Sequence, residues 1–258
     1  MTFVSVLLRL LAVVVALAVV GTPAAGIADP TGSSPVAHRP DARPDTKPLR
    51  GLTIALDPGH QLGNSRHSRE INRLVPAGGF QKPCNTTGTA TNRGVAESTV
   101  NFRLSRAVKR RLEALGAVVR MTRTTNSVYR WGPSVGARLM VSLHADGASS
   151  SGRGFHVIAP TNRKPWTDDI AAASLRLAKT LRGSLVRSGI PRSNYTAGRT
   201  GLAVRSDLGT LNMSDVPVAM IEIDNMRNAT DARRMTSAKG RTRYAVAVVR
   251  GIRTYLRR

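Results

Sequence analysis

Two histidines and a carboxylate lie at or near the ends of apolar runs in this sequence. His60 follows the run 52–56 after a short Pro-Gly turn, His144 closes the run 139–143, and Glu222 lies within a third such run. Ligands and chemistry collect at the carboxyl ends of strands in an α/β sheet. Histidine nitrogen and carboxylate oxygen are the ligands of hydrolytic zinc sites, so the pattern favours such a site.

Glu97 supplies a third metal ligand. A catalytic zinc takes about three protein ligands and keeps one position open for water. Glu97 opens a helix predicted over residues 97–115, whose apolar residues recur at helical spacing. His60, Glu97 and His144 are far apart in the sequence, so only the fold can bring them together. Taken singly, each histidine is more often an ordinary loop residue than a ligand, and it is their joint position at strand ends that favours a metal site.

Glu222 has a different environment, because apolar residues surround it in the sequence. A carboxylate in such a run carries a desolvation cost, and burial raises its pKa. A raised pKa suits a general base that takes a proton from water and passes it to a leaving nitrogen. The alternative is a structural ion pair with one of the many arginines.

Other polar residues form a second tier of candidates. Asp57 and Asp146 are candidates to orient the metal ligands by hydrogen-bonding to them on the side away from the metal. A turn-stabilising role is the simpler interpretation of both residues. His67 lies in a polar stretch, and we interpret His156, in a strand after a glycine-rich turn, as structural. Cys84 is the single cysteine, so it has no internal disulfide partner.

Apolar, β-rich runs alternate with helical periods along the chain. Strands are predicted at 52–56, 117–122, 139–143, 154–159, 202–205 and 216–223, and helices at 97–115, 167–188 and 237–256. Thr167 is the predicted N-cap of the second helix. This alternation predicts a three-layer α/β/α domain with a mixed, mostly parallel sheet of about six strands.

Two connections depart from a regular α/β pattern. The polar stretch 61–94 is long for a compact domain, which indicates a rim or lid facing a substrate, or else a disordered insertion. The connection 123–138 is too rich in glycine and proline for a full crossover helix. Either the strands around it pair differently, or a helix is missing there.

The chain begins with the layout of a secretory signal peptide. Residues 1–28 contain one arginine, an apolar run and small residues, so we expect export with cleavage near Ala25 or Ala28, to a periplasm, cell wall or medium. A retained membrane anchor is the alternative. Residues 29–49 read as a proline-rich linker, and residues 50–258 as one domain.

The chain is strongly basic, with 39 Lys and Arg against 15 Asp and Glu and a net charge of +24. For an exported protein, such a field favours anionic cell-wall polymer or a membrane surface, although an arginine-rich genome would give the same composition. Aromatic residues make up only 4%, which leaves few stacking platforms, so no nucleic acid is expected. We expect a monomer.

Four motifs in order give the chain a resemblance to a known family. They are Asp57-Pro58-Gly59-His60, Glu97 at a helix start, Ser142-Leu143-His144-Ala145-Asp146, and the strand that carries Glu222 before Asn225. Over residues 52–256 the sequence resembles the zinc-dependent N-acetylmuramoyl-L-alanine amidases of bacterial cell walls, especially secreted actinobacterial members without a wall-binding module.

The resemblance implies roles for particular residues. His60, Glu97 and His144 would hold Zn²⁺, and Glu222 would be the catalytic glutamate. The implied substrate is peptidoglycan, cut at the amide between N-acetylmuramic acid and the first L-alanine of the stem peptide.

The sequence departs from this family before His144. The family carries a helix with an arginine and an Ala-Asn pair there, for which residues 134–138 leave no room, and a second cysteine expected near Ser134 is absent. A catalytically impaired or non-enzymatic cationic wall-binding protein is therefore the alternative. A serine hydrolase is a weaker one, because the G-x-S-x-G match at 132–136 precedes a strand instead of opening a helix.

Overall fold

The computed structural model describes residues 46–126 and 137–257. Its centre is a six-stranded sheet in the order β4-β1-β5-β8-β6-β7. Strands β4, β1, β5 and β8 are parallel, β6 is antiparallel to β8, and β7 is parallel to β6. The predicted mixed, mostly parallel sheet is confirmed.

Every predicted strand is present. The bounds are β1 Thr53–Pro58, β4 Val118–Met121, β5 Met140–Asp146, β6 His156–Pro160, β7 Leu202–Arg205 and β8 Val218–Asn225. The residues of β8 are almost all buried, as are those of its neighbour β5 and of β1 beyond β5. Strands buried on both faces read as continuous apolar runs, which is why the sequence pattern found them.

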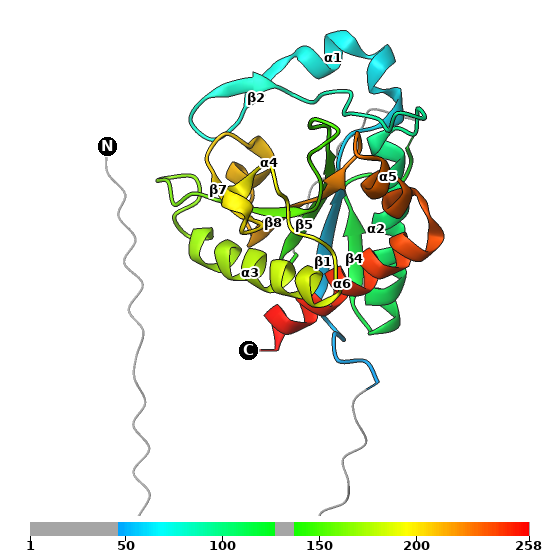
Figure 1. Ribbon diagram of the computed structural model, residues 1–258. Coiled ribbons are helices and arrows are strands. Elements are labelled where there is room, and N and C mark those ends of the chain that lie inside the picture. The colour runs from blue at the N-terminus through cyan, green and yellow to red at the C-terminus, as the bar shows by residue number, and fades with distance from the viewer. Residues whose placement is uncertain (1–45, 127–136, 258) are drawn as a thin grey trace, which may run out of the picture. The chain divides into compact units, whose positions relative to one another are not determined.

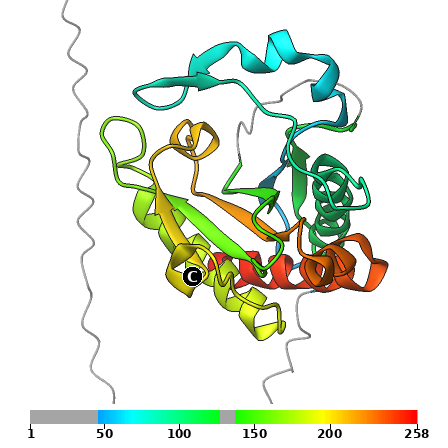
Figure 2. The ribbon, with the colours of Figure 1, turned by 45° about the horizontal axis from the view of Figure 1, so that its top comes forward.

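Three long helices pack on one face of the sheet: α2 Glu97–Ala114, α3 Ala171–Arg187 and α6 Ala238–Leu256. Helix α2 lies over β1 and β5, α3 lies over β6 and β8, and α6 packs against both helices (Figure 1, Figure 2). Their apolar stripes join the inward side chains of the strands in the main hydrophobic core.

The opposite face has a thinner cover. A second, smaller core there includes Met140, Ile158, Leu211 and Met220, with Leu211 from the short helix α4 Gly209–Asn212. Segment 61–94 lies above this side (Figure 1), and the Asn212 side chain donates to its Ala77 carbonyl at 2.8 Å. The three-layer architecture is therefore confirmed with unequal outer layers.

Segment 61–94 has structure of its own. It contains the 3-10 helix η1 Leu62–Arg66, helix α1 Ser68–Asn72 and an antiparallel hairpin of β2 Leu74–Pro76 and β3 Gln81–Pro83. The single cysteine, Cys84, follows the hairpin and is half-buried. The alternative of a disordered insertion is therefore wrong.

Some element boundaries and helices differ from the prediction. Helix α3 begins at Ala171, and Thr167 is not its N-cap: the Thr167 hydroxyl donates to the Thr161 carbonyl at 2.6 Å within a preceding turn. Helix α5 Ala229–Thr236 and the 3-10 helix η2 Ala197–Arg199 were not predicted. The folded part also includes Leu49, which is buried one residue before the expected domain boundary.

Strands β4 and β5 both pair with β1, one on each side. The connection 123–138, which is too rich in glycine and proline for a full crossover helix, thus joins the edge strand β4 to β5 on the far side of β1. Residues 127–136 of this connection, including Ser134 of the G-x-S-x-G match, lie outside the described residues. The described chain resumes at Ala137 and continues into β5, not into the helix that a nucleophile turn requires.

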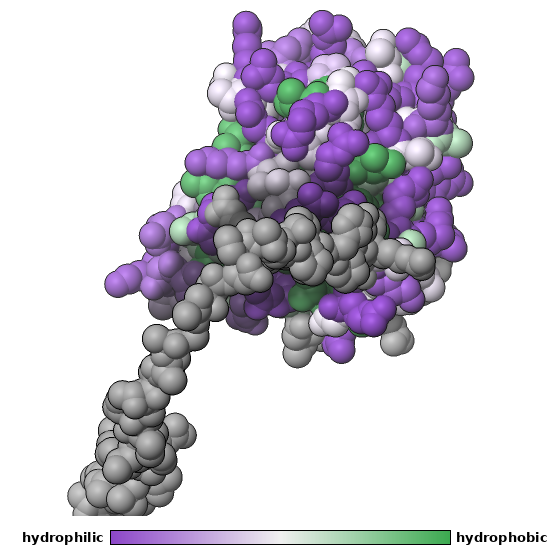
Figure 3. Space-filling view, turned by 90° about the horizontal axis from the view of Figure 1, so that it is seen from below, coloured by the Kyte–Doolittle hydropathy of each residue, from purple (hydrophilic) through white to green (hydrophobic). Residues whose placement is uncertain are grey.

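The described surface is mainly hydrophilic on the side where α6 lies, with isolated hydrophobic residues between hydrophilic ones (Figure 3). Among the described residues, no helix is long and apolar enough to cross a membrane.

Candidate metal centre

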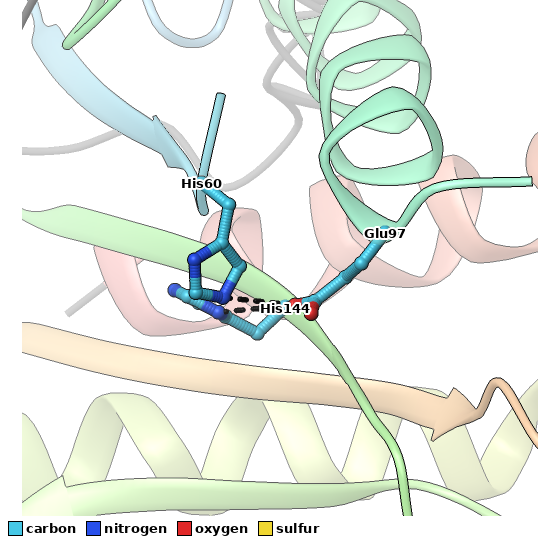
Figure 4. Close-up of side chains that lie close together, drawn as sticks. All are labelled: His60, Glu97 and His144. Carbon is cyan, nitrogen blue, oxygen red and sulfur yellow. Dashed lines mark ion pairs between the residues drawn. The ribbon is translucent and has the colours of Figure 1, made fainter. Parts of the chain in front are cut away.

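His60, Glu97 and His144 meet at the carboxyl edge of the sheet (Figure 4). His60 follows β1, His144 lies near the end of β5, and Glu97 begins α2. The Oε1 atom of Glu97 lies 3.4 Å from Nε2 of His60 and 3.2 Å from Nδ1 of His144. The potential ligand atoms of the three residues all lie within 4.8 Å of one another.

The backbone and loop around His60 fix its ring. His60 has a φ of 57°, in the left-handed region that non-glycine residues rarely adopt. Its Nδ1 lies 3.1 Å from both Asn85 Oδ1 and the Thr86 carbonyl, two acceptors. Nδ1 therefore carries the proton, and the lone pair of Nε2 points toward Glu97. The sequence reasoning missed Asn85 and Thr86, whose only signal was the length of their polar segment.

Glu97 is buried and fully hydrogen-bonded. Its Oε2 accepts from the Thr89 amide at 3.0 Å, and its Oε1 accepts from the Ala145 amide at 3.0 Å and from Asn101 Nδ2 at 3.2 Å. Burial alone raises the pKa of Glu97, but His144, His60 and the Thr89 amide outweigh it and hold the pKa well below its usual range. The carboxylate is therefore ionised, as a metal ligand must be.

The electrostatics of His144 also suit a bound cation. Burial alone lowers the pKa of His144, but the hydrogen bond to Glu97 and the charges of Glu222 and Glu97 raise it to about 9. The surrounding carboxylates thus favour a positive charge at this position, which a metal ion would supply in place of the proton.

The donor set fits zinc in type, and in the spacing of Glu97 from each histidine. Two imidazole nitrogens and one carboxylate oxygen make up the ligands of hydrolytic zinc sites. Ligands placed tetrahedrally at about 2.1 Å from zinc are about 3.4 Å apart. The separations of 3.4 and 3.2 Å between Glu97 and the two histidines match that spacing.

Glu222 lies directly beside His144. The two residues are register partners in β5 and β8, so their side chains leave the same face of the sheet. Burial, with the charges of Asp146 and Glu97, raises the pKa of Glu222 to about 8 against the opposing effect of His144. Among the described residues no arginine forms an ion pair with Glu222, so the structural ion-pair alternative lacks its partner.

His156 flanks Glu222 on the other side, because β6 pairs His156 with Glu222. His156 is buried, and its Nδ1 lies 3.6 Å from Oδ2 of Asp146 without a hydrogen bond, whereas the Tyr195 hydroxyl donates to that oxygen at 2.8 Å. Burial lowers the pKa of His156. The neighbourhood of Glu222 is therefore a row of three polar side chains in an otherwise apolar sheet, and the sequence reasoning missed this row.

The contacts of Asp57 favour the turn-stabilising role over the ligand-orienting one. Its two oxygens accept from the Thr122 hydroxyl at 2.6 Å and from the Ser142 hydroxyl at 2.7 Å, which joins β1 to residues on both sides. His67 is not part of the cluster of candidate ligands, and its Nδ1 lies 3.6 Å from Oε1 of Glu70. The partners that orient the candidate ligands are backbone groups and amide side chains.

Asp57→Ala should therefore destabilise the fold without removing any group from the candidate metal site. Two buried hydroxyls lose a charged acceptor, so we expect the free energy of unfolding to fall by about 2–3 kcal/mol. Denaturant unfolding measures that change, and zinc analysis of the folded variant should still give one equivalent. Loss of zinc at unchanged stability would instead make Asp57 an orienting residue.

Gly59→Ala should disrupt the site directly. A Cβ on Gly59 would lie 2.2 Å from Cε1 of His144, far inside van der Waals contact. The His144 ring would have to move, so we expect zinc affinity to fall at least about tenfold, as measured by competition with a chelating dye. Gly183→Ala is the matched control, because a Cβ there meets only the flexible end of Arg187. Equal zinc affinity in both variants would contradict the prediction.

Comparison with known proteins decides the family. The family model described as N-acetylmuramoyl-L-alanine amidase matches residues 54–254, a span that includes all the residues of the candidate site. The chain belongs to this amidase family. It is 38% identical over 219 residues to N-acetylmuramoyl-L-alanine amidase Rv3717 of Mycobacterium tuberculosis, covering 81% of this chain and 88% of that protein.

Solved amidase structures share the fold. The crystal structure of the N-acetylmuramyl-L-alanine amidase Ami1 from Mycobacterium smegmatis matches with a TM-score of 0.75 and 36% identity, covering 81% of this chain and 98% of that one. The apo form of Ami1 from Mycobacterium abscessus matches with a TM-score of 0.75 and 37% identity, covering 81% and 100%. The resemblance to actinobacterial amidases is thus confirmed.

Proposed function

We propose that this protein is a zinc-dependent peptidoglycan hydrolase that cuts the amide between N-acetylmuramic acid and the L-alanine of the stem peptide. His60, Glu97 and His144 hold the zinc, and Glu222 is the catalytic base. One observation carries the proposal: in a chain of this amidase family, three zinc-type donors converge at the sheet edge with Glu222 in register beside one of them.

The chain's own residues account for the movement of the proton. A zinc ion at the site would polarise the scissile carbonyl and acidify a water molecule. Glu222 accepts a proton from the attacking water and returns it to the leaving nitrogen. Its raised pKa suits both transfers near neutral pH, since a strongly acidic carboxylate would be a poor base.

The remaining parts of the proposal concern where the enzyme acts. An exported protein, released from its signal peptide near Ala25 or Ala28, meets peptidoglycan outside the membrane. A net charge of +24 attracts it to anionic wall polymer. We propose that it acts there as a monomer.

Digestion of purified peptidoglycan tests the activity. The proposal predicts release of stem peptides with a new L-alanine amino terminus and no new reducing sugar ends. A chelator should stop this release, and added zinc should restore it.

The competing interpretations give different outcomes. A cationic wall-binding protein would sediment with peptidoglycan without releasing amines. A serine hydrolase would be inhibited by a phosphonate and unaffected by the chelator. Either outcome would overturn the proposed function.

A further inference from the structure

Helices α3 and α6 have an unusual distribution of charge. Four basic residues lie on α3 and five on α6, and neither helix contains an aspartate or a glutamate. Exposed helices ordinarily space opposite charges three or four residues apart, and like charges at that spacing are destabilising. Basic residues without acidic neighbours thus carry a cost in the free protein that an anionic partner would relieve.

A groove lies between these two helices. It has a volume of about 250 Å³ and is lined by Arg176, Lys179, Thr180, Gly183, Arg187 and Thr254. We call it the α3–α6 groove. Its lining contains three cationic side chains and two hydroxyls but no acidic group.

The cations of the groove have no counterion within the described part of the chain. Arg176, Lys179 and Arg187 are exposed, and no ion pair joins any of them to a described carboxylate. Elsewhere the chain does pair its cations, as in Lys109 with Glu113 and Arg205 with Asp207. Other exposed cations, such as Arg103 and Arg106 of α2, also have no carboxylate partner among the described residues, so the groove is distinguished by three such cations that line one hollow.

Gly183 shapes the groove. A glycine inside a helix costs about 1 kcal/mol relative to alanine, so its presence there needs a reason. The missing side chain leaves room along α3, and Nη1 of Arg187 lies 3.2 Å from where a Cβ of Gly183 would be. The guanidinium of Arg187 therefore lies along the helix beside Gly183.

The hydroxyls complement the cations chemically. Thr180 Oγ1 donates to the Leu177 carbonyl at 2.8 Å, and Thr254 Oγ1 donates to the Arg250 carbonyl at 2.9 Å. Each hydroxyl already donates its one proton to a backbone carbonyl. Toward a ligand in the groove, the two hydroxyl oxygens can therefore act only as hydrogen-bond acceptors. Cations with neighbouring acceptors suit a ligand that carries both an anionic group and hydroxyl groups.

The groove is separate from the candidate metal centre. Helix α3 packs with Val157 and Ile221 on one face of the sheet, whereas His144 and Glu222 alternate with these residues and leave the other face. A ligand in the groove would leave the catalytic edge free. This side of the molecule also shows a mainly hydrophilic surface (Figure 3).

We propose that the α3–α6 groove binds a phosphodiester-linked polyol or sugar polymer. Phosphate groups would pair with the three cations, and polymer hydroxyls would donate to Thr180 and Thr254. A bilayer fits less well, because Leu177, Leu181 and Leu185 of α3 are buried in the core, which leaves Val186 as the exposed large apolar side chain of that helix. That the polymer is a cell-wall component rests on the proposed function, but the binding itself does not.

Calorimetric titration of the mature protein with a synthetic glycerol-phosphate oligomer tests the proposal. The triple variant Arg176→Gln/Lys179→Gln/Arg187→Gln should bind at least about tenfold more weakly, since each cation near an anionic array contributes several-fold in affinity. The control variant Arg103→Gln/Arg106→Gln/Arg110→Gln removes the same charge from exposed positions of α2 and should stay within about twofold of the parent.

A second variant tests the shape of the groove without changing its charge. Gly183→Leu should fill the floor and weaken binding about as much as the triple variant, while leaving thermal unfolding close to that of the parent. Uncharged dextran should not bind to any of these proteins.

Several results would overturn the proposal. Equal losses in the groove and control triple variants would show that only net charge attracts the oligomer. Tighter binding to phosphatidylglycerol vesicles than to the oligomer, lost in the triple variant, would assign the groove to a membrane. Amine release from soluble muropeptides should be equal in parent and groove variants, so a failure of the proposed amidase activity is recognised separately from a failure of binding.

Discussion

Glu222→Gln is expected to stop amide hydrolysis while the fold and the zinc content remain those of the parent. Glutamine has the shape of glutamate, so β8 and its register with His144 should be unchanged. The amide cannot accept a proton from water, so the rate should fall by about 10²–10⁴-fold, the usual contribution of general acid–base catalysis. The site otherwise keeps its three candidate ligands.

The measurement is the rate of amine release from purified peptidoglycan, with zinc determined on the same preparation. Glu113→Gln is the matched control, because Glu113 lies near the exposed end of α2 and pairs only with Lys109 among the described residues. Its rate should equal that of the parent. If Glu222→Gln retains more than about a tenth of the parent rate, Glu222 is not the base.

His144→Ala should remove zinc and activity together. His144 is one of three candidate ligands, and its loss should weaken zinc binding by at least about 10²-fold, because a two-ligand site holds zinc poorly. Equilibrium competition with a chelating dye measures the affinity. His67→Ala is the control, since the His67 side chain pairs with the exposed Glu70 and is not among the clustered candidate ligands, so this variant should bind zinc as the parent does.

Because of His144, we expect the stability of the metal-free protein to fall as the pH rises, while the apparent affinity for zinc increases. In the metal-free protein, the His144 pKa of about 9 lies above its ordinary value of 6.5. The charged form therefore stabilises the fold fully below pH 6.5, and this contribution is lost as the pH rises through 9. Zinc needs the neutral ring, so its apparent affinity should rise about tenfold per pH unit up to that pKa.

Thermal unfolding between these pH values, with and without zinc, tests the prediction. The metal-free protein should melt at progressively lower temperature as the pH rises, while the stabilisation by zinc grows. A metal-free melting temperature that rises with pH would contradict the assigned environment of His144. A constant stabilisation by zinc across the range would show that no proton is displaced.

The central strands of the sheet could be predicted because they are buried on both faces. The part of β8 from Val218 to Ile223 is apolar apart from Glu222, so its pattern does not depend on knowing its neighbours. Helix α5 was missed because it has only eight residues and few apolar ones, so its N-cap Asn228 was the main local signal. Thr167 was wrongly predicted as a helix N-cap, because a threonine hydroxyl stabilises a turn as readily as it caps a helix.

The residues of the candidate site could also be recognised from the sequence. His60, Glu97, His144 and Glu222 each stand out as a polar side chain at the end of a strand, at a helix start or inside an apolar run. A carboxylate in an apolar run is costly, so chemistry is a good reason for its presence. The sequence alone could therefore nominate these residues and the kind of metal they would suit.

Only the tertiary structure decided how these residues meet. The order β1-β5-β8-β6 places His144 and His156 on either side of Glu222, and the loop that carries Asn85 and Thr86 fixes the ring of His60. Strand order and loop contacts depend on long-range packing, whereas local patterns record only burial and backbone preference. The sequence by itself thus determined which side chains could do chemistry, whereas the fold determined the distances between them and their pKa values.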